Sequence, residues 1–232
     1  PMPFENTKDA PTIVQRAAKP QKPQKKQRAV YRVPKLEKLR LAAKKSGCTV
    51  KNIHGAKLDP AMLDKLVQMT DENMGDLISD RAKSEINSNL SDIDTYLIVM
   101  ECKTLERKTE VVGFVAFQIE DTSGEGHVMV LELQLVERLR RKKFGTLLIN
   151  EVGTWAAAHS INTIHLIAAE YNLPAMAFYA VAGFSNSATM DDGLGLRSSK
   201  QHLMKRFAVP AAAPAAPAAP AAPAAPVAPV AP

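Results

Sequence analysis

One carboxylate interrupts the most apolar run of the chain. Val128–Leu135 reads VMVLELQL, and Glu132 is its acidic residue. Burial disfavours the charged form of a carboxyl group and raises its pKa toward the range in which it accepts protons usefully. Glu132 is therefore the first candidate for a general base, and His127 is a lesser one. The alternative is an ordinary strand residue that faces solvent or pairs with Arg138 or Arg140.

A basic turn follows this run. Arg138–Gly145 reads RLRRKKFG, and from Phe144 onward apolar residues recur at helical spacing. A helix N-terminus presents unpaired N–H groups and the positive end of the helix dipole, so a basic turn there suits a phosphate or pyrophosphate. A solvated basic loop explains the same residues equally well on spacing alone.

Hydrophobic periodicity predicts the elements that must position these residues. In the apolar strand, Val128, Val130 and Glu132 alternate with Met129, Leu131 and Leu133. Helices are expected at 34–46, from Pro60 to about Ile78, around 81–90, at 144–159 and from Pro174 to Gly183. Further strands are expected at 49–53, 96–101, 110–119 and 163–168, with a turn at 121–126 and closing strands at Phe184 and 200–207. This order predicts an α/β domain with a mixed, mostly antiparallel sheet flanked by helices.

Composition indicates one domain with two tails. The chain has 232 residues, 46% hydrophobic and 23% charged, and a net charge of +6. Residues 1–45 hold 13 Lys+Arg and 3 Asp+Glu, or +10, which leaves −4 for the rest. Residues 1–33 are expected to form a disordered basic arm that either contacts nucleic acid or is simply solvated, and 34–207 the domain. Residues 208–232 contain only Ala, Pro and Val, which predicts an extended tail.

Several classes of protein are excluded by what the sequence lacks. No apolar segment reaches the roughly 18 residues of a membrane span, and the start shows no signal peptide, so an intracellular protein without membrane contact is expected. Cys48 and Cys102 lie outside any CxxC pattern. Buried, reduced thiols are therefore expected in place of a disulfide, a metal site or a nucleophile.

The strand, basic turn and helix are followed by Asn172-x-x-Ala175-x-x-Phe178-Tyr179-x-x-x-Gly183-Phe184. Together these motifs resemble the GNAT superfamily of N-acetyltransferases. The resemblance implies acetyl-CoA as co-substrate, with strand backbone holding the pantetheine arm and turn amides holding the pyrophosphate. The implied cofactor contacts are Leu133, Gln134, Leu135, Arg140, Arg141, Lys142, Lys143, Phe144, Gly145, Thr146 and Asn172. As an alternative, Asn172 is an ordinary loop or cap residue.

Shorter blocks within about 50–207 resemble the NatD-type N-alpha-acetyltransferases. They are Leu58-Asp59-Pro60-Ala61, Thr70-x-x-Asn73-Met74, Tyr96-Leu97-Ile98, Glu132-x-Gln134-Leu135 and Arg140-Arg141-Lys142. That resemblance implies acetylation of the N-terminal amine of a core histone, in the cytoplasm and nucleus. It implies Glu132 as catalytic base. The wider GNAT resemblance implies Tyr179 as general acid, although a packing role for Tyr179 explains the residue nearly as well. Peptide contacts are implied at Glu120, Asp121 and Leu131.

The chain departs from both patterns. Lys143 stands where the superfamily turn usually has its first glycine, and a lysine there costs about a kcal/mol or more if the position needs positive φ. Met129 and Leu131 flank Glu132 where NatD-type enzymes have tyrosines. Two other functions therefore stay open: a catalytically inactive module whose arm binds nucleic acid or the ribosome, and an acetyltransferase for lysine or small amines.

Overall fold

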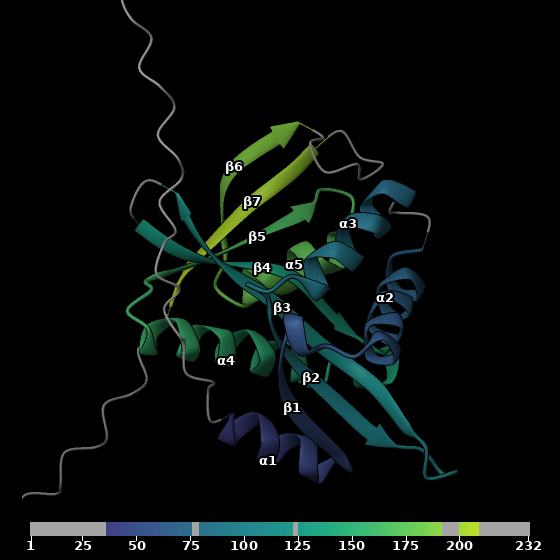
Figure 1. The fold of residues 1–232 in the computed structure, drawn as a ribbon. Helices are drawn as coiled ribbons and strands as arrows, with labels where there is room; N and C mark the ends of the chain where they lie inside the picture. The colour runs from purple at the N-terminus through teal and green to yellow at the C-terminus, as the bar shows by residue number, and fades with distance from the viewer. Residues whose placement is uncertain (1–35, 76–78, 123–124, 192–199, 209–232) are drawn as a thin grey trace, which may run out of the picture. The chain divides into compact units, whose positions relative to one another are not determined.

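The computed structural model describes residues 36–75, 79–122, 125–191 and 200–208, all within the unit that begins at Arg32. These residues form a seven-stranded sheet in the order β1-β2-β3-β4-β5-β7-β6 (Figure 1). The strands are β1 Cys48–His54, β2 Tyr96–Lys103, β3 Thr109–Thr122, β4 Glu125–Leu135, β5 Thr163–Ala169, β6 Ser185–Asp191 and β7 Lys200–Phe207. The α-helices are α1 Glu37–Lys45, α2 Pro60–Met74, α3 Asp80–Ser91, α4 Phe144–Ala158 and α5 Leu173–Val181. Only the β4–β5 pair is parallel among these strands, which confirms the mixed α/β fold.

The helices begin and end where local chemistry predicts. The Asp59 side chain accepts a hydrogen bond from the backbone N–H of Met62 at 2.9 Å, which caps α2 just before Pro60. Gly47 and Gly183 follow α1 and α5 with φ of 70° and 87°, values that glycine adopts without a Cβ clash. The predicted end of α2 near Ile78 lies outside the described residues. None of the described helices has the length and apolar character to cross a membrane.

The helices α2 and α3 cover one face of the sheet. Their apolar side chains pack on alternate residues of β2 and β3, and the buried members of this cluster are Met62, Leu66, Met69, Leu90, Leu97, Val99, Val111, Phe114 and Ala116. We call this set the α2 cluster. Met62 and Met69 of α2 are thus core residues.

The opposite face is covered by α4, and α1 lies against α4 and β1 (Figure 1). Trp155 of α4 is 1% exposed, and its ring centroid lies 5.0 Å from that of Phe117 on β3. Leu39 and Ala43 of α1 are fully buried. Helices therefore cover both faces of the sheet at β3 and at β4, the strand that contains Glu132.

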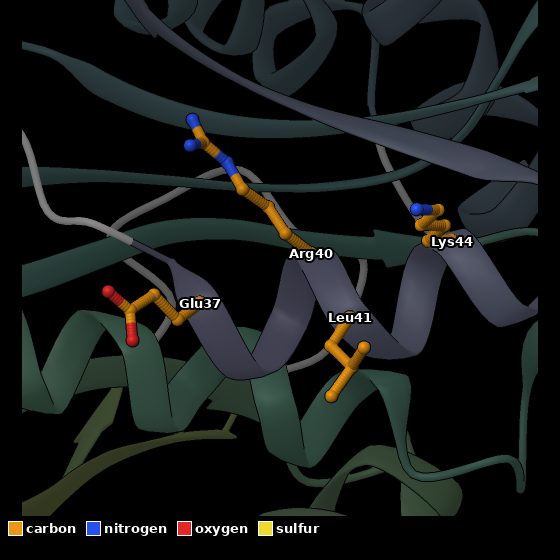
Figure 2. A pocket seen from close by; sticks show the side chains of 4 residues that line it. All are labelled: Glu37, Arg40, Leu41 and Lys44. Atoms are coloured by element: carbon orange, nitrogen blue, oxygen red, sulfur yellow. The ribbon is translucent and has the colours of Figure 1, made fainter.

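Two surface hollows lie away from β4. Figure 2 shows the side chains that line the larger one, about 460 Å³, along α1: Glu37, Arg40, Leu41 and Lys44. The smaller one, about 220 Å³, lies over β1 and β2 and includes Lys51, Glu101 and Cys102. Neither hollow contains a residue of β4 or α5, so neither bears on the chemistry of Glu132.

The structure overturns two sequence-based expectations. Cys48 and Cys102 form a disulfide, because the antiparallel register of β1 and β2 places them directly opposite each other. Their separation of 54 residues in sequence concealed this proximity. Residues Glu120 and Asp121 are also not in a turn: β3 runs to Thr122 and Asp121 pairs with Gly126 of β4.

Candidate functional site

A bulge in β4 decides which face Glu132 occupies. Val130 pairs with Phe117 and Glu132 pairs with the adjacent Ala116, so Leu131 is the extra residue. Opposed residues share a face and successive residues take opposite faces. Phe117 packs on Trp155 of α4 whereas Ala116 belongs to the α2 cluster. Glu132 therefore faces α2, and the simple alternation that groups it with Val130 is wrong.

The parallel strands β4 and β5 separate just before Glu132. They pair only from Val128 to Val130, opposite Ile164 to Leu166, although β4 continues to Leu135 and β5 to Ala169. Beyond Val130, β5 continues to pair with β7, and β4 has no strand partner on the β5 side among the described residues. Unpaired backbone N–H and C=O groups at a strand edge can bind an extended, amide-containing ligand.

The carboxyl group of Glu132 lies at this opening. Burial raises the pKa of Glu132 to about 7, and the hydrogen bond that Gln134 Nε2 donates to Oε2 at 2.9 Å opposes this rise only in part. The residue as a whole is only partly buried. A carboxyl group whose pKa is raised toward neutrality by burial, next to an opening in the sheet, is suited to accept a proton from a bound amine.

The phenol of Tyr179 on α5 is the second titratable group here. Burial, and then the negative charge of Glu132, raise the pKa of Tyr179, so the phenol stays protonated and able to donate at neutral pH. Its ring also lies 5.2 Å from that of Phe178 and 5.7 Å from that of Phe184, centroid to centroid. Tyr179 therefore packs among aromatic rings and also lies close enough to Glu132 to interact with its charge.

The basic turn before α4 has the backbone form of an anion site. Arg141 and Lys143 have positive φ, 60° and 67°, and Lys143 is the N-cap of α4. Among the described residues none accepts a hydrogen bond from the backbone N–H groups of 141–146. These amides lie at the positive end of α4, where phosphate groups bind in many proteins. Lys143 thus adopts the strained conformation in which the superfamily uses glycine.

The start of α4 is also closely packed. A Cβ atom on Gly145 would lie 3.1 Å from the Phe178 ring and 3.7 Å from Leu135 Cδ1, so α4, α5 and the end of β4 meet at this glycine. Phe144 is buried beside it, and Thr146 is half-buried. The turn, the strand edge and Tyr179 therefore border a single site.

A chain of side-chain hydrogen bonds connects the turn to Glu132. Arg140 Nη2 donates to Asn73 Oδ1 at 2.6 Å, Asn73 Nδ2 donates to Gln134 Oε1 at 2.9 Å, and Gln134 donates to Glu132. Arg140 Nε and Asn73 Nδ2 also donate to the carbonyl of Leu135, at 3.1 and 3.3 Å. Sequence reasoning assigned no role to Asn73. Its signal was present, because Asn73 continues the buried helical stripe of Met62, Leu66 and Met69 with a polar side chain.

The other predicted contact residues divide into two groups. Leu131, Leu133 and Leu135 are partly buried on the open half of β4, and Lys142 is exposed on the turn. Asn172 caps α5, with Oδ1 accepting from the Ala175 N–H at 3.3 Å. This contact is the one that the alternative interpretation predicts.

The second group lies at the opposite end of β4. Glu120 Oε2 is 3.4 Å from His127 Nε2, and the His127 ring lies 4.3 Å from that of His165. Asp121 follows Glu120 in β3 and pairs with Gly126 of β4. His127 lies toward the other end of β4, before the residues that pair with β5, so the structure does not bring it together with Glu132 and Tyr179.

Comparisons with known proteins agree with this geometry. The sequence model of the acetyltransferase (GNAT) family matches residues 64–184, more than half of the chain. No curated protein sequence matches the chain.

Solved structures share the fold at low sequence identity. Arabidopsis thaliana NAA60, solved with a bisubstrate analogue and with acetyl-CoA, is similar at 17% identity and a TM-score of 0.54. In the bisubstrate complex, the match covers 68% of this chain and 98% of that one. Ard1 from Thermoplasma volcanium is 16% identical over 70% of this chain and 99% of that one, with a TM-score of 0.53. An aminoglycoside 6'-acetyltransferase type Ii is 16% identical over 70% of this chain and 98% of that one, with a TM-score of 0.51. The family match, the sheet that opens beside Glu132 and the turn before α4 lead to one conclusion: the chain belongs to the acetyltransferase (GNAT) family.

Proposed function

We propose that this protein transfers the acetyl group of acetyl-CoA to the N-terminal amine of a protein, with a core histone as the leading substrate. The observation that carries the proposal is the Glu132 carboxyl group, with a pKa raised to about 7 by burial, at the point where β4 leaves β5. The resemblance to NatD-type enzymes supplies the class of acceptor.

The residues present fit acetyl-CoA. The unpaired amides of 141–146 and the side chains of Arg141, Lys142 and Lys143 suit its pyrophosphate. The backbone of Leu133–Leu135 suits the amides of its pantetheine arm, and Asn172, the residue that caps α5, is the further polar contact that the resemblance implies. When bound, the co-substrate supplies an acetyl group activated as a thioester.

Two side chains of the protein account for the protons. Glu132 accepts the proton that the acceptor amine loses as its nitrogen bonds to the acetyl carbon, directly or through a water molecule. Tyr179 donates its proton to the sulfur as the carbon–sulfur bond breaks, so that the thiol leaves uncharged. The raised pKa of each group, about 7 for Glu132, fits these roles at neutral pH.

The basicity of Glu132 favours a terminal amine over a lysine side chain. An α-amino group has a pKa of about 8 and a lysine side chain about 10.4. Transfer of a proton to a carboxylate whose pKa is about 7 therefore costs roughly 1 kcal/mol from an α-amine but roughly 5 kcal/mol from a lysine. Glu120, 40% exposed on the same face of the sheet, adds a carboxylate for a basic peptide such as a histone tail.

The test is turnover of labelled acetyl-CoA with a panel of acceptors. The panel contains core-histone N-terminal peptides, the same peptides with a blocked N-terminus, an acidic N-terminal peptide, a lysine-containing blocked peptide and spermidine. We expect acetylation of the free N-termini, fastest on the histone peptides, and about a hundredfold slower turnover in Tyr179→Phe. Equal rates on blocked and free peptides would assign the enzyme to lysine.

A complete lack of turnover would support the inactive module, and nucleic-acid affinity of the full chain compared with a chain lacking 1–33 would then test the arm. The proposed location is the cytoplasm and nucleus. Because disulfides are rare in those compartments, this location requires Cys48 and Cys102 to be reduced in the cell. Alkylation of thiols in intact cells, followed by mass spectrometry, measures their state.

A further inference from the structure

The hydrogen-bond chain from Arg140 to Glu132 runs in one direction. A guanidinium can only donate and an ionised carboxylate can only accept, so the two ends fix the orientation of both amides between them. Asn73 must turn its oxygen to Arg140 and its nitrogen to Gln134, and Gln134 must turn its nitrogen to Glu132. The donors and acceptors in the structure follow this order, at 2.6, 2.9 and 2.9 Å.

We propose that Asn73 and Gln134 are positioning residues that orient the Glu132 carboxylate and connect it to the guanidinium of Arg140. The inference rests on the proposed function for its catalytic meaning, but the connection itself is a property of the free protein. It joins α2 to the open half of β4 and to the turn that follows β4, which lie 61 and 67 residues further along the sequence.

The burial of these residues supports the inference. Gln134 is 8% exposed and lies on the same face of β4 as Glu132, two residues along the strand. Its amide therefore has little access to water, and its contacts with Asn73 and Glu132 replace the bonds that water would make. Asn73 is half-buried at the last turn of α2, and Arg140 is exposed. The chain of hydrogen bonds thus leads from the exposed Arg140 inward to Glu132.

Few charged groups act on this carboxylate. Among the described residues, Tyr179 on α5 is the titratable side chain that faces Glu132 from another element, and its phenol is neutral. The pairing residue on β3 is the apolar Ala116, and α2 contributes the neutral Asn73. Donors that are polarised toward a carboxylate favour its charged form, so loss of any link should raise the proton affinity of Glu132.

The test is a direct titration of Glu132 in the full-length protein without ligand. Protein labelled with ¹³Cδ-glutamate is titrated by NMR, and the Glu132 signal is assigned by its loss in Glu132→Gln. We expect upward pKa shifts of about one unit in Gln134→Met, about half a unit in Asn73→Ala and a few tenths in Arg140→Met. Gln134→Met keeps the length of the side chain and removes its donor.

Two control variants distinguish the loss of a hydrogen bond in this network from the loss of a nearby charge or of any amide on α2. Lys142→Met removes a neighbouring cation that has no bond to Asn73, and it should shift the pKa less than Arg140→Met does. Gln68→Ala removes an exposed α2 amide whose partner is Glu72, and it should leave Glu132 unchanged. If Gln134→Met does not fold, Asn73→Ala and Arg140→Met, which alter less buried sites, carry the test. A Glu132 pKa equal to the wild-type value in Asn73→Ala, or equal shifts for Arg140→Met and Lys142→Met, overturns the inference.

Kinetics separate this inference from the proposed function. With an active enzyme, the acidic limb of the kcat profile should move to higher pH in the same order as the NMR values. Ordered NMR shifts without turnover on any amine would reject the function and retain the positioning role. Normal turnover without the NMR shifts would retain the function and reject the positioning role.

Discussion

The two halves of β4, before and after the point where β5 separates, differ in pairing and in polarity. From Val128 to Val130 the strand pairs with β3 on one side and β5 on the other, and Val128 and Val130 are 0% and 5% exposed. From Leu131 to Leu135 it pairs with β3 alone, and four of these five residues are only partly buried. The fully paired half holds the sheet together, whereas the open half carries the acid, the amide and the unpaired backbone that a ligand can use.

The difference shows that strand pairing contributes to the role of a residue in this strand. An acidic residue is stable in these apolar surroundings because Glu132 is only partly buried at the opening of the sheet. Gln134 also donates a hydrogen bond to its carboxylate. The same carboxylate at Val128 would lie in a fully buried position, with strands on both sides. The following four predictions test this division.

The largest expected effect is on catalysis in the open half. Glu132→Gln should lower kcat by about 10²–10⁴-fold, because the proton acceptor is lost, and leave acetyl-CoA affinity within about twofold. Steady-state rates and calorimetric binding measure the two quantities. Glu110→Gln is the matched control, because Glu110 forms an exposed ion pair with Arg138 at 2.9 Å and lies outside the site. Near-normal turnover in Glu132→Gln would remove the base from the mechanism.

The fully paired half should respond in the opposite way. Ile164 of β5, paired with Val128, is 0% exposed. Ile164→Ala should lower the free energy of unfolding by about 2–5 kcal/mol through lost contacts and a cavity, with little change in kcat while the protein stays folded. Urea unfolding and activity at low temperature give both values. Leu133→Ala, in the open half, should lose less stability and more activity; the reverse result would contradict the division.

The raised pKa of Glu132 predicts a pH dependence of stability. The folded-state pKa is raised from 4.5 to about 7, so the native state binds this proton more tightly than the unfolded state does. The contribution to stability is full below pH 4.5 and is lost as pH rises through 7, a difference of about 3 kcal/mol at most. Glu132→Gln should therefore gain stability over the wild type between pH 5 and pH 8. Urea unfolding at intervals of pH measures the gain, and parallel curves for the two proteins would show that Glu132 titrates normally.

The smallest expected effect is at the turn that borders the open half. Lys143 has a φ of 67°, which costs a non-glycine residue roughly 1 kcal/mol. Lys143→Gly should raise the free energy of unfolding by about 0.5–1 kcal/mol, measured by thermal unfolding. Lys142→Gly removes the same charge at a residue without positive φ, and it should stabilise nothing. A comparison of acetyl-CoA affinity in the two variants then isolates the charge of Lys143.

Local patterns made most of this architecture predictable. Asp59 before Pro60, Gly47 and Gly183 mark helix ends through contacts with near neighbours, and the apolar runs mark strands. Glu132 and the basic turn were also found from the sequence, because a polar residue in an apolar strand and a cationic turn before a helix are local signals. Their roles remain proposals.

What sequence reasoning missed depends on pairing between distant segments. The disulfide depends on the register of β1 against β2, and the face of Glu132 depends on one extra residue relative to β3. Asn73 contacts Gln134, 61 residues further along the sequence, only because α2 ends beside β4. The disulfide and the face of Glu132 leave no mark within a window of neighbouring residues, whereas Asn73 is marked as a polar residue on the buried stripe of α2 but not by what it contacts.

The extra residue in β4 makes the face of Glu132 depend on one irregularity in the pairing of two strands. If Leu131 paired regularly with Ala116, Glu132 would lie opposite Val115 and its carboxylate would turn toward Trp155 and the interior under α4. Every backbone hydrogen bond of the sheet could still form, yet the acid would have left the opening. Deletion of Leu131 would remove the bulge and keep Glu132 opposite Ala116, so it should leave the carboxylate on the α2 face and remove only the local distortion of the strand.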